Sequence, residues 1–395
     1  MTVVVLCSTI AQAFGRFTYS LLLPPIEREL AGSYAVAGLA GAVNVLAYVF
    51  GVLVVRLLGA RLGPTTSIRA GLAASAVGLA VLALAGSVPV LSMGLALTGL
   101  GAALIWLPSP GFVGSVVHPS KRGLAIGFIG SGIGAGIVVA GALTSIVRGA
   151  DGATDWRSVY ATEAALALVV LVLCFAVLRS PSSTPAASDP VAVSLRQVPG
   201  WRGLTSGYAA YGLAYSIYVS YLVAALEDVG FSPGHASAVF TVVGVALVLG
   251  GVVLGRLSDR WGRGRTLVLG HLVMAGAILL AITGREPLAT TSAVLFGLMM
   301  SGLPSVVAAH LADFLPPRQF GAVFARCTLA FALAQTCGTP LGGFLAEVAG
   351  GFWVAFAVAA GMAGLGALLS LDVVRARIDP GVGDVRRGTG TAAPK

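Results

Sequence analysis

Twelve apolar runs, each long enough to cross a lipid bilayer, divide this chain of 395 residues. The hydrocarbon core of a bilayer is roughly 30 Å thick, and a helix needs about 20 apolar residues to span it. Hydrophobic residues make up 57% of the chain, which excludes an ordinary soluble domain. The period-2 alternation of membrane strands is absent. We therefore predict an all-α integral membrane protein with twelve transmembrane helices. They lie near residues 2–24, 34–57, 69–87, 90–117, 123–147, 158–178, 202–226, 236–256, 266–284, 288–309, 320–346 and 352–372.

The basic residues are distributed unequally between the two sides that these helices define. Eighteen of the 24 Lys and Arg fall on one side, whereas Arg28, Arg148, Arg157 and Arg285 fall on the other. Cytoplasmic loops carry the excess of Lys and Arg, so both termini are expected in the cytoplasm of a multi-pass protein of the cell inner membrane. The net charge of +9 thus reports topology, and no nucleic-acid partner is expected. The first run has no basic segment before it, so it is interpreted as a retained span and not as a cleaved signal peptide.

A polar segment rich in Pro and Ser, at 179–200, is the one long break between apolar runs. Its composition is typical of a flexible linker. We predict an N-terminal six-helix half, a cytoplasmic linker, a C-terminal six-helix half and a cytoplasmic tail. Their ranges are 1–178, 179–200, 201–372 and 373–395.

The two halves repeat each other at an offset of about 200 residues. The stretch G-V-L-V-V-R-L-L-G from Gly51 aligns with G-V-V-L-G-R-L-S-D from Gly251, and L-P-S at 107–109 aligns with L-P-S at 303–305. The common order of these matches indicates a duplication.

A charged loop, G-R-L-S-D-R-W-G-R-G-R, runs from Gly255 to Arg265 between two apolar runs. It resembles the signature loop of the major facilitator superfamily. The stretches G-R-F-x-Y-x-L-L-L-P at 15–24, D-W-R at 155–157 and Q-T-C-G-T-P-L-G-G at 335–343 resemble its YbfB-like branch. The resemblance implies two pseudo-symmetric six-helix bundles, a substrate site between them near the bilayer midplane, and alternating access.

The resemblance also implies a conformational gate in this loop. The gate residues are Gly255, Asp259, Arg260, Gly262 and Arg263. We expect Asp259 to accept hydrogen bonds from a neighbouring helix start near Gly123, because helix N-termini favour negative charge. The first copy of the loop, at 56–63, is degenerate and has Gly59 in the place of the Asp.

Three ionisable residues lie inside predicted spans: Arg16, Glu163 and Arg326. Such residues are costly in a bilayer and are functional candidates. Arg16 shares a polar helix face with Gln12 and lies beside Tyr19, and we select all three as substrate contacts, because a guanidinium suits an anionic group of a substrate. The alternative is a structural ion pair between Arg16 and Glu163, and Glu163 is also the best carboxylate for coupling. Arg326 is expected near the cytoplasmic side, in reach of Asp313, in a structural role.

A stripe of tyrosines follows the seventh predicted helix, and its hydroxyls and rings suit a cavity for an amphipathic solute. Packing is the alternative for the same stripe. We select Tyr211, Tyr215 and Tyr218 as substrate contacts. Trp106 and Gln335 are weaker candidates, and Asn44 is a candidate for a hydrogen bond to a neighbouring helix.

These features predict a secondary active transporter for a small organic solute. The sequence contains no ATP-binding loop, no catalytic constellation and no metal-like spacing, so we expect neither an enzyme nor a cofactor nor a metal. Arg16 favours an organic anion, the tyrosines favour an amphipathic compound, and the resemblance favours export. The alternatives are a membrane sensor or receptor on a transporter scaffold, and an anion exchanger or uniporter without proton coupling. The expected partners are the lipid bilayer and a small solute, with or without protons, and the expected state is a monomer.

Overall fold

The computed structural model describes residues 2–109, 112, 122–149, 154–178, 195–315 and 317–378. Most of the predicted linker and nearly all of the predicted tail lie outside these residues. The first described helices are α1 (Thr2–Ser8), the π-helices η1 (Thr9–Phe17) and η2 (Glu27–Ala31), α2 (Thr18–Leu21), α3 (Leu23–Ile26), α4 (Tyr34–Ala83), α5 (Val88–Trp106), α7 (Arg122–Val147) and α8 (Trp156–Val177). The 3-10 turn η4 (Leu195–Gln197) is followed by α9 (Trp201–Asp228), α10 (Pro233–Trp261), α11 (Arg263–Ala281), α12 (Glu286–Phe314), α13 (Pro317–Ala349) and α14 (Trp353–Ile378).

Among the described residues, eleven helical stretches are long and apolar enough to cross a membrane, and no strand occurs beyond one isolated bridge. Exposed apolar side chains cover the outside of the bundle, for example Leu168, Val172 and Phe175 on α8, where they are suited to contact lipid. This confirms the predicted all-α membrane fold. The last helix continues to Ile378, six residues beyond the predicted boundary at 372.

The helices begin where side chains can satisfy the free N–H groups of a first turn. Ser33 accepts from the N–H of Val36 at the start of α4. Asp155 accepts from the first N–H groups of α8, and Ser232 caps α10 just before Pro233. These short polar residues mark the ends of the apolar runs.

The first predicted span does not form one regular helix. It is divided into α1, the π-helix η1, α2 and the start of α3, with an irregular residue, Leu22, before Pro24 and Pro25. Proline removes a backbone donor and crowds the preceding turn, which accounts for the interruption near residue 22. The π-helical turn η1 carries Arg16, and π-helical turns inside helices are frequent at functional sites.

Two loops at corresponding places in the repeat share an unusual backbone conformation. Gly63 lies at a kink that divides α4 into two helical parts, and it has φ 71° and ψ 162°. Gly262, between α10 and α11, has φ 89° and ψ 149°. Residues with a Cβ avoid this region, so glycine is required at both turns. The same backbone geometry in the intact charged loop and in its degenerate copy agrees with a duplicated chain.

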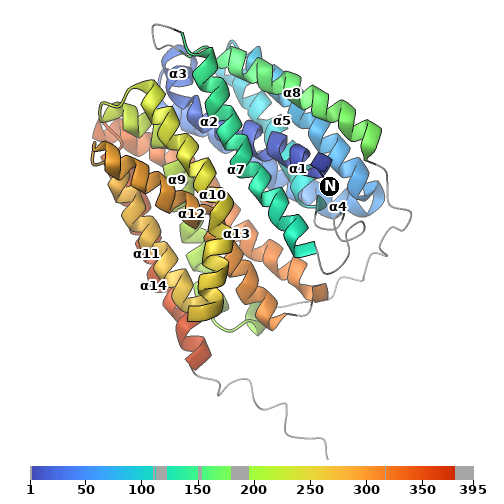
Figure 1. Ribbon diagram of the computed structural model, residues 1–395, viewed down its shortest axis with the longest axis vertical. Helices are drawn as coiled ribbons and strands as arrows, with labels where there is room; N and C mark the ends of the chain where they lie inside the picture. The colour runs from blue at the N-terminus through green and yellow to red at the C-terminus, as the bar shows by residue number, and fades with distance from the viewer. Residues whose placement is uncertain are drawn as a thin grey trace, which may run out of the picture.

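The helices pack as two groups, defined here as the N-terminal group (α1 to α8) and the C-terminal group (α9 to α14). In the first, α4 packs on α5 and α8, and η1 packs on α5 and α7; in the second, α9 packs on α13 and α14, and α10 packs on α12. Figure 1 shows the blue to green helices on one side and the yellow to red helices on the other, with α7 beside α10 at the boundary.

Glycines allow the two groups to approach closely at this boundary. A Cβ added to Gly134 on α7 would lie 2.5 Å from the carbonyl oxygen of Gly244 on α10. A Cβ on Gly343 of α13 would lie 2.2 Å from the carbonyl oxygen of Tyr34 on α4. Small residues therefore form both contacts, as in other close helix pairs in membranes.

Polar contacts between the groups gather at one end of the bundle, which we call the closed end. Arg28 of η2 pairs with Glu227 of α9 at 3.1 Å. Arg148, which follows α7, donates to the carbonyl oxygen of Pro233 at 3.1 Å and to Ser237 at 2.9 Å on α10.

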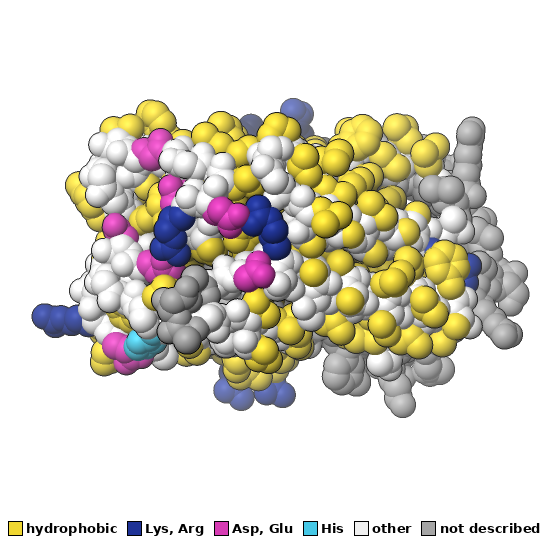
Figure 2. All heavy atoms as spheres, turned by 90° about the horizontal axis from the view of Figure 1, so that it is seen from above, with side chains coloured by type: hydrophobic (Ala, Val, Ile, Leu, Met, Phe, Trp, Pro, Cys, Tyr) yellow, Lys and Arg dark blue, Asp and Glu magenta, His cyan; other side chains and the backbone are white. Residues whose placement is uncertain are grey.

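A third contact at the closed end joins α4 to α13: the N–H of Ala35 donates to Glu347 at 3.0 Å. Acidic and basic side chains crowd together at this end, beside a mostly hydrophobic flank (Figure 2). The contacts from η2, α4 and α7 hold the two groups together at the closed end.

Candidate substrate site

One cavity of about 30 Å³ lies at the boundary between the two helix groups. Its lining comes from η1, α2, α4 and α5 of the first group and from α9 and α13 of the second. The lining residues are Arg16, Phe17, Tyr19, Ser20, Gly41, Asn44, Val45, Leu95, Tyr215, Ser216, Val219, Ser220, Gln335 and Thr339. A volume of this size holds about two water molecules.

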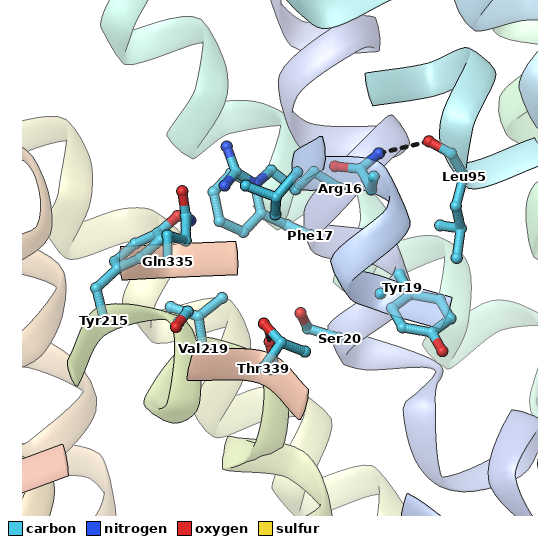
Figure 3. A pocket seen from close by; sticks show the side chains of 14 residues that line it. Arg16, Phe17, Tyr19, Ser20, Leu95, Tyr215, Val219, Gln335 and Thr339 are labelled. Atoms are coloured by element: carbon cyan, nitrogen blue, oxygen red, sulfur yellow. Dashed lines mark hydrogen bonds between the residues drawn. The ribbon is translucent and has the colours of Figure 1, made fainter. Parts of the chain in front are cut away.

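Arg16 is the single charged side chain among these lining residues. Its side chain reaches toward Tyr215 and Gln335 across the cavity (Figure 3). The Nη2 atom of Arg16 is buried and has no hydrogen-bond partner among the described residues. A buried guanidinium nitrogen without an acceptor is costly, so half-buried Arg16 presents an unsatisfied positive donor to whatever enters the cavity.

The backbone just before Arg16 is held by two polar side chains of neighbouring helices. Asn44 of α4 donates to the carbonyl oxygens of Gly15 at 3.0 Å and Leu95 at 2.9 Å, and to Thr98 at 3.0 Å. Thr98 of α5 also donates to the Gly15 carbonyl oxygen at 3.0 Å. The Asn44 bond to Leu95 is drawn dashed in Figure 3. This clamp fixes the π-helical turn and thereby the position of the guanidinium.

We expect Asn44→Leu to lower the thermal stability of the protein, because it removes the Asn44 hydrogen bonds from a buried polar cluster and leaves Thr98 as the one side chain bonded to Gly15 and Leu95 among the described residues. The loss should amount to about 1–3 kcal/mol, measured as a lower unfolding midpoint in detergent. Ser75→Ala is the matched control, since Ser75 donates only to the carbonyl oxygen of Gly71 in its own helix. An Asn44→Leu midpoint equal to that of the control would contradict the clamp.

Four of the eight predicted substrate residues meet in this cavity: Arg16, Tyr19, Tyr215 and Gln335. Tyr19 also donates to the carbonyl oxygen of Ala37 at 2.7 Å. Arg16 and Gln335 are both close neighbours of the Tyr215 hydroxyl. The cavity therefore has one cationic end and hydroxyl and amide groups around it.

The other four predicted substrate residues do not line the cavity. Tyr211 donates to the carbonyl oxygen of Met300 at 2.8 Å, and the Tyr218 hydroxyl bonds to Ser292 at 2.7 Å, so these hydroxyls join α9 to α12. Gln12 is buried in η1. Trp106 ends α5 and packs on the core.

Glu163 lies on the side of the first span away from the cavity. It is fully buried, and its Oε1 accepts from the Thr18 hydroxyl at 2.6 Å. The ion pairs found among the described residues do not include one between Arg16 and Glu163, so the structural pair proposed as an alternative is not formed in this conformation. Arg326, the third intramembrane candidate, is exposed and does not reach the cavity.

The charged loop is organised around Arg263 at the end opposite to the closed end. Its guanidinium bonds to Ser258 at 2.6 Å, to Asp259, and to Asp313 of α12 at 3.1 Å. The partner found for Asp259 is thus in its own loop. The predicted partner near Gly123 lies where side chains are not described, and a gating role of Asp259 and Arg260 stays a prediction.

Arg157 and Glu29 form a further ion pair at the closed end, within the N-terminal group. The hydrogen bond from Arg157 holds the pKa of the Glu29 carboxyl below its usual value, and Trp156 donates to the same carboxylate at 2.7 Å.

The described residues contain no cluster of His, Cys, Asp and Glu that could hold a metal ion.

The fold and a cavity shared by two packed helix groups define a membrane transporter of the major facilitator type. The chain belongs to the family described as uncharacterised MFS-type transporter YbfB, whose model matches residues 8–371. The resemblance noted in the sequence is thereby confirmed.

Relatives and solved structures agree with this assignment. The chain is 28% identical over 338 residues to monocarboxylate transporter 13 of Bos taurus, covering 82% of this chain and 77% of that protein. It is 25% identical over 268 residues to the uncharacterized MFS-type transporter YttB of Bacillus subtilis (strain 168), covering 66% of each.

Two solved structures share the fold. A D-xylose-proton symporter superposes with a TM-score of 0.76 at 19% identity, covering 93% of this chain and 96% of its own. A bacterial homologue of the human lysosomal transporter Spinster, inward-facing and unoccupied, superposes with a TM-score of 0.70 at 17% identity, covering 95% and 94%.

Proposed function

We propose that the protein carries a small organic anion of the monocarboxylate class across the cytoplasmic membrane by alternating access. The observation that carries the proposal is the unpaired Arg16 guanidinium in a cavity shared by both helix groups. Carboxylates are the acceptors that a guanidinium binds best, through two parallel hydrogen bonds.

The cavity supplies no negative charge of its own. None of its described lining residues is an Asp or a Glu, so the counter-charge of Arg16 has to come from a ligand. A neutral sugar would leave that charge uncompensated in a low-dielectric site. The relative named a monocarboxylate transporter points to the same chemical class.

The remaining lining fits a carboxylate with a short organic body. Phe17 and Val219 offer apolar surface, while Tyr215, Gln335 and Ser20 offer hydroxyl and amide groups. Most small-ligand sites combine apolar walls with a few fixed polar groups in this way.

The closed end is assigned to the outside of the cell and the opposite end to the cytoplasm. The Arg-rich loop around Arg263 lies at the opposite end, in agreement with the positive-inside rule. The protein then exports or imports its anion according to the gradients, because each closure exposes the same cavity to one side only.

Uptake into proteoliposomes tests the proposal. Vesicles containing the purified protein should take up labelled pyruvate saturably and faster than vesicles without protein, and unlabelled lactate should compete. Labelled D-xylose serves as the neutral comparison and should enter at the background rate. Xylose uptake equal to pyruvate uptake, or pyruvate uptake at background, would refute the anion assignment.

A further inference from the structure

We propose that Glu163 is a proton-binding site buried in the N-terminal helix group, and that its proton travels with the anion. Glu163 lies on α8 with none of its surface exposed. Its Oε1 is bonded to Thr18, and its Oε2 is buried without a partner among the described residues. The hydroxyl of Tyr160, one turn earlier on α8, is likewise buried and unpartnered. Two orphaned polar atoms therefore lie together at membrane depth.

A carboxylate in this position would need a counter-charge that the structure does not supply. Moving an isolated ionised carboxylate into a low-dielectric interior costs many kcal/mol, and such a group takes up a proton instead. None of the ion pairs among the described residues involves Glu163. In this conformation Glu163 is a neutral carboxylic acid.

The charged and titratable groups described on the surrounding elements form no ion pair and no hydrogen bond with Glu163. They are Arg157, Tyr160 and Cys174 on α8, Cys7 on α1, Arg16 on η1, Tyr19 on α2, and Tyr34, Tyr48 and Arg69 on α4.

The three described arginines of this set all have other surroundings. Arg157 bonds to Glu29 and to the carbonyl oxygen of Ala85, and Arg69 bonds to the carbonyl oxygen of Leu178. Arg16 lines the cavity. Glu163 and Tyr19 are both near neighbours of the Tyr160 hydroxyl.

The short helix α2 connects this acid to the cavity. Thr18 bonds to Glu163, and its neighbour Tyr19 lines the cavity and is held to α4 through the carbonyl oxygen of Ala37. Arg16 precedes Thr18 by two residues. Protonation of Glu163 can therefore change the strength of one hydrogen bond on the turn that carries both cavity residues.

The proposed cycle conserves charge without a carboxylate in the cavity. One anion binds at Arg16 and one proton binds at Glu163, so a neutral pair crosses with each turnover. Both leave when the cavity opens to the other side. The anion half of this inference rests on the proposed function, whereas the proton site follows from the burial of Glu163 alone.

Infrared spectroscopy of the purified protein tests the proton site without any substrate. The wild-type protein at neutral pH should show the C=O stretch of a buried protonated carboxyl group. The band should disappear in Glu163→Gln and persist in Glu286→Gln, which changes an exposed carboxylate at the start of α12. A spectrum without this band, or a band that survives in Glu163→Gln, would overturn the proposal.

Gradient-driven transport tests the coupling. At one proton per anion, an inward gradient of one pH unit drives about tenfold accumulation of pyruvate in vesicles whose membrane potential is clamped. Glu163→Gln, which mimics the protonated acid, should exchange internal for external pyruvate but accumulate none. Glu286→Gln should behave as wild type.

The two experiments separate the proposals from each other. Glu163→Gln vesicles that still accumulate pyruvate under the pH gradient would overturn the role of Glu163 while leaving the anion assignment intact. Wild-type vesicles that carry no pyruvate would count against the substrate class, and the infrared band would then decide on the proton site by itself.

Discussion

Replacing Arg16 by alanine should lower pyruvate uptake by about 10- to 100-fold, because the hydrogen bonds of a charged group to a carboxylate contribute about 1.5–3 kcal/mol. The loss should fall on substrate affinity, measured as a raised KM in proteoliposomes. Folding should be retained, because the Nη2 atom has no partner in the described structure to lose. Arg16→Lys should keep the charge but lose the two-pronged geometry, and should give an intermediate uptake.

Arg285→Ala is the matched control for this series. Arg285 is exposed just before α12 and lies away from the cavity. Its loss changes the net charge equally and should leave uptake unchanged. If Arg16→Ala transported pyruvate like the control, at equal protein content, Arg16 would not be the anion site.

Linking the two helix groups at the closed end should stop transport completely and reversibly. Arg28→Cys combined with Glu227→Cys replaces an ion pair that joins η2 to α9. A short bifunctional reagent that forms a disulfide with each thiol would then hold the closed end shut until it is reduced, and alternating access requires that end to open. The four native cysteines, Cys7, Cys174, Cys327 and Cys337, are first replaced by alanine or serine. Uptake is measured before linking, after linking and after reduction.

The structure provides a control pair at the same end of the bundle. Glu29 and Arg157 form an ion pair within the N-terminal group, so linking cysteines at these two positions does not join the groups. Transport should survive in that double variant. Full transport through the linked Arg28 and Glu227 positions would mean that the closed end does not separate during the cycle.

The sequence could predict the membrane fold because hydropathy reports directly on contact with lipid. The loop from Gly255 to Arg265 predicted the family for a similar reason, since a sequence motif is local in the chain. The irregular first span could not be predicted in this way. It is long and apolar enough to be predicted as one helix, and its breaks follow from Pro24 and Pro25 and from contacts of Gly15 with two other helices.

The tyrosine stripe shows why the site was predicted only in part. A spacing of three and four residues places Tyr211, Tyr215 and Tyr218 on one side of a helix. In the structure α9 is mostly buried, with neighbours on nearly every side. The hydroxyl of Tyr215 reaches the cavity, whereas those of the other two find partners on α12. Which of the three hydroxyls faces the cavity depends on the partners that Met300 and Ser292 offer on α12, and helical spacing carries no information about those partners.

Asn44 and Thr98 were harder to recognise as positioning residues. They lie 54 residues apart and belong to no motif, and their shared acceptor is a backbone carbonyl at Gly15. A buried Asn in an apolar helix was the one available signal, and it predicted a hydrogen bond to a neighbouring helix without naming the acceptor. The three-dimensional arrangement shows that the acceptor is the residue next to Arg16.

Direct binding of pyruvate to the purified protein tests the central claim, that the cavity at Arg16 holds the transported anion. Isothermal titration of the wild-type protein in detergent should give saturable binding of one pyruvate per chain. The same titration of Arg16→Ala, at an unchanged unfolding midpoint, should give no detectable binding. Equal pyruvate affinity in the two proteins would contradict the claim.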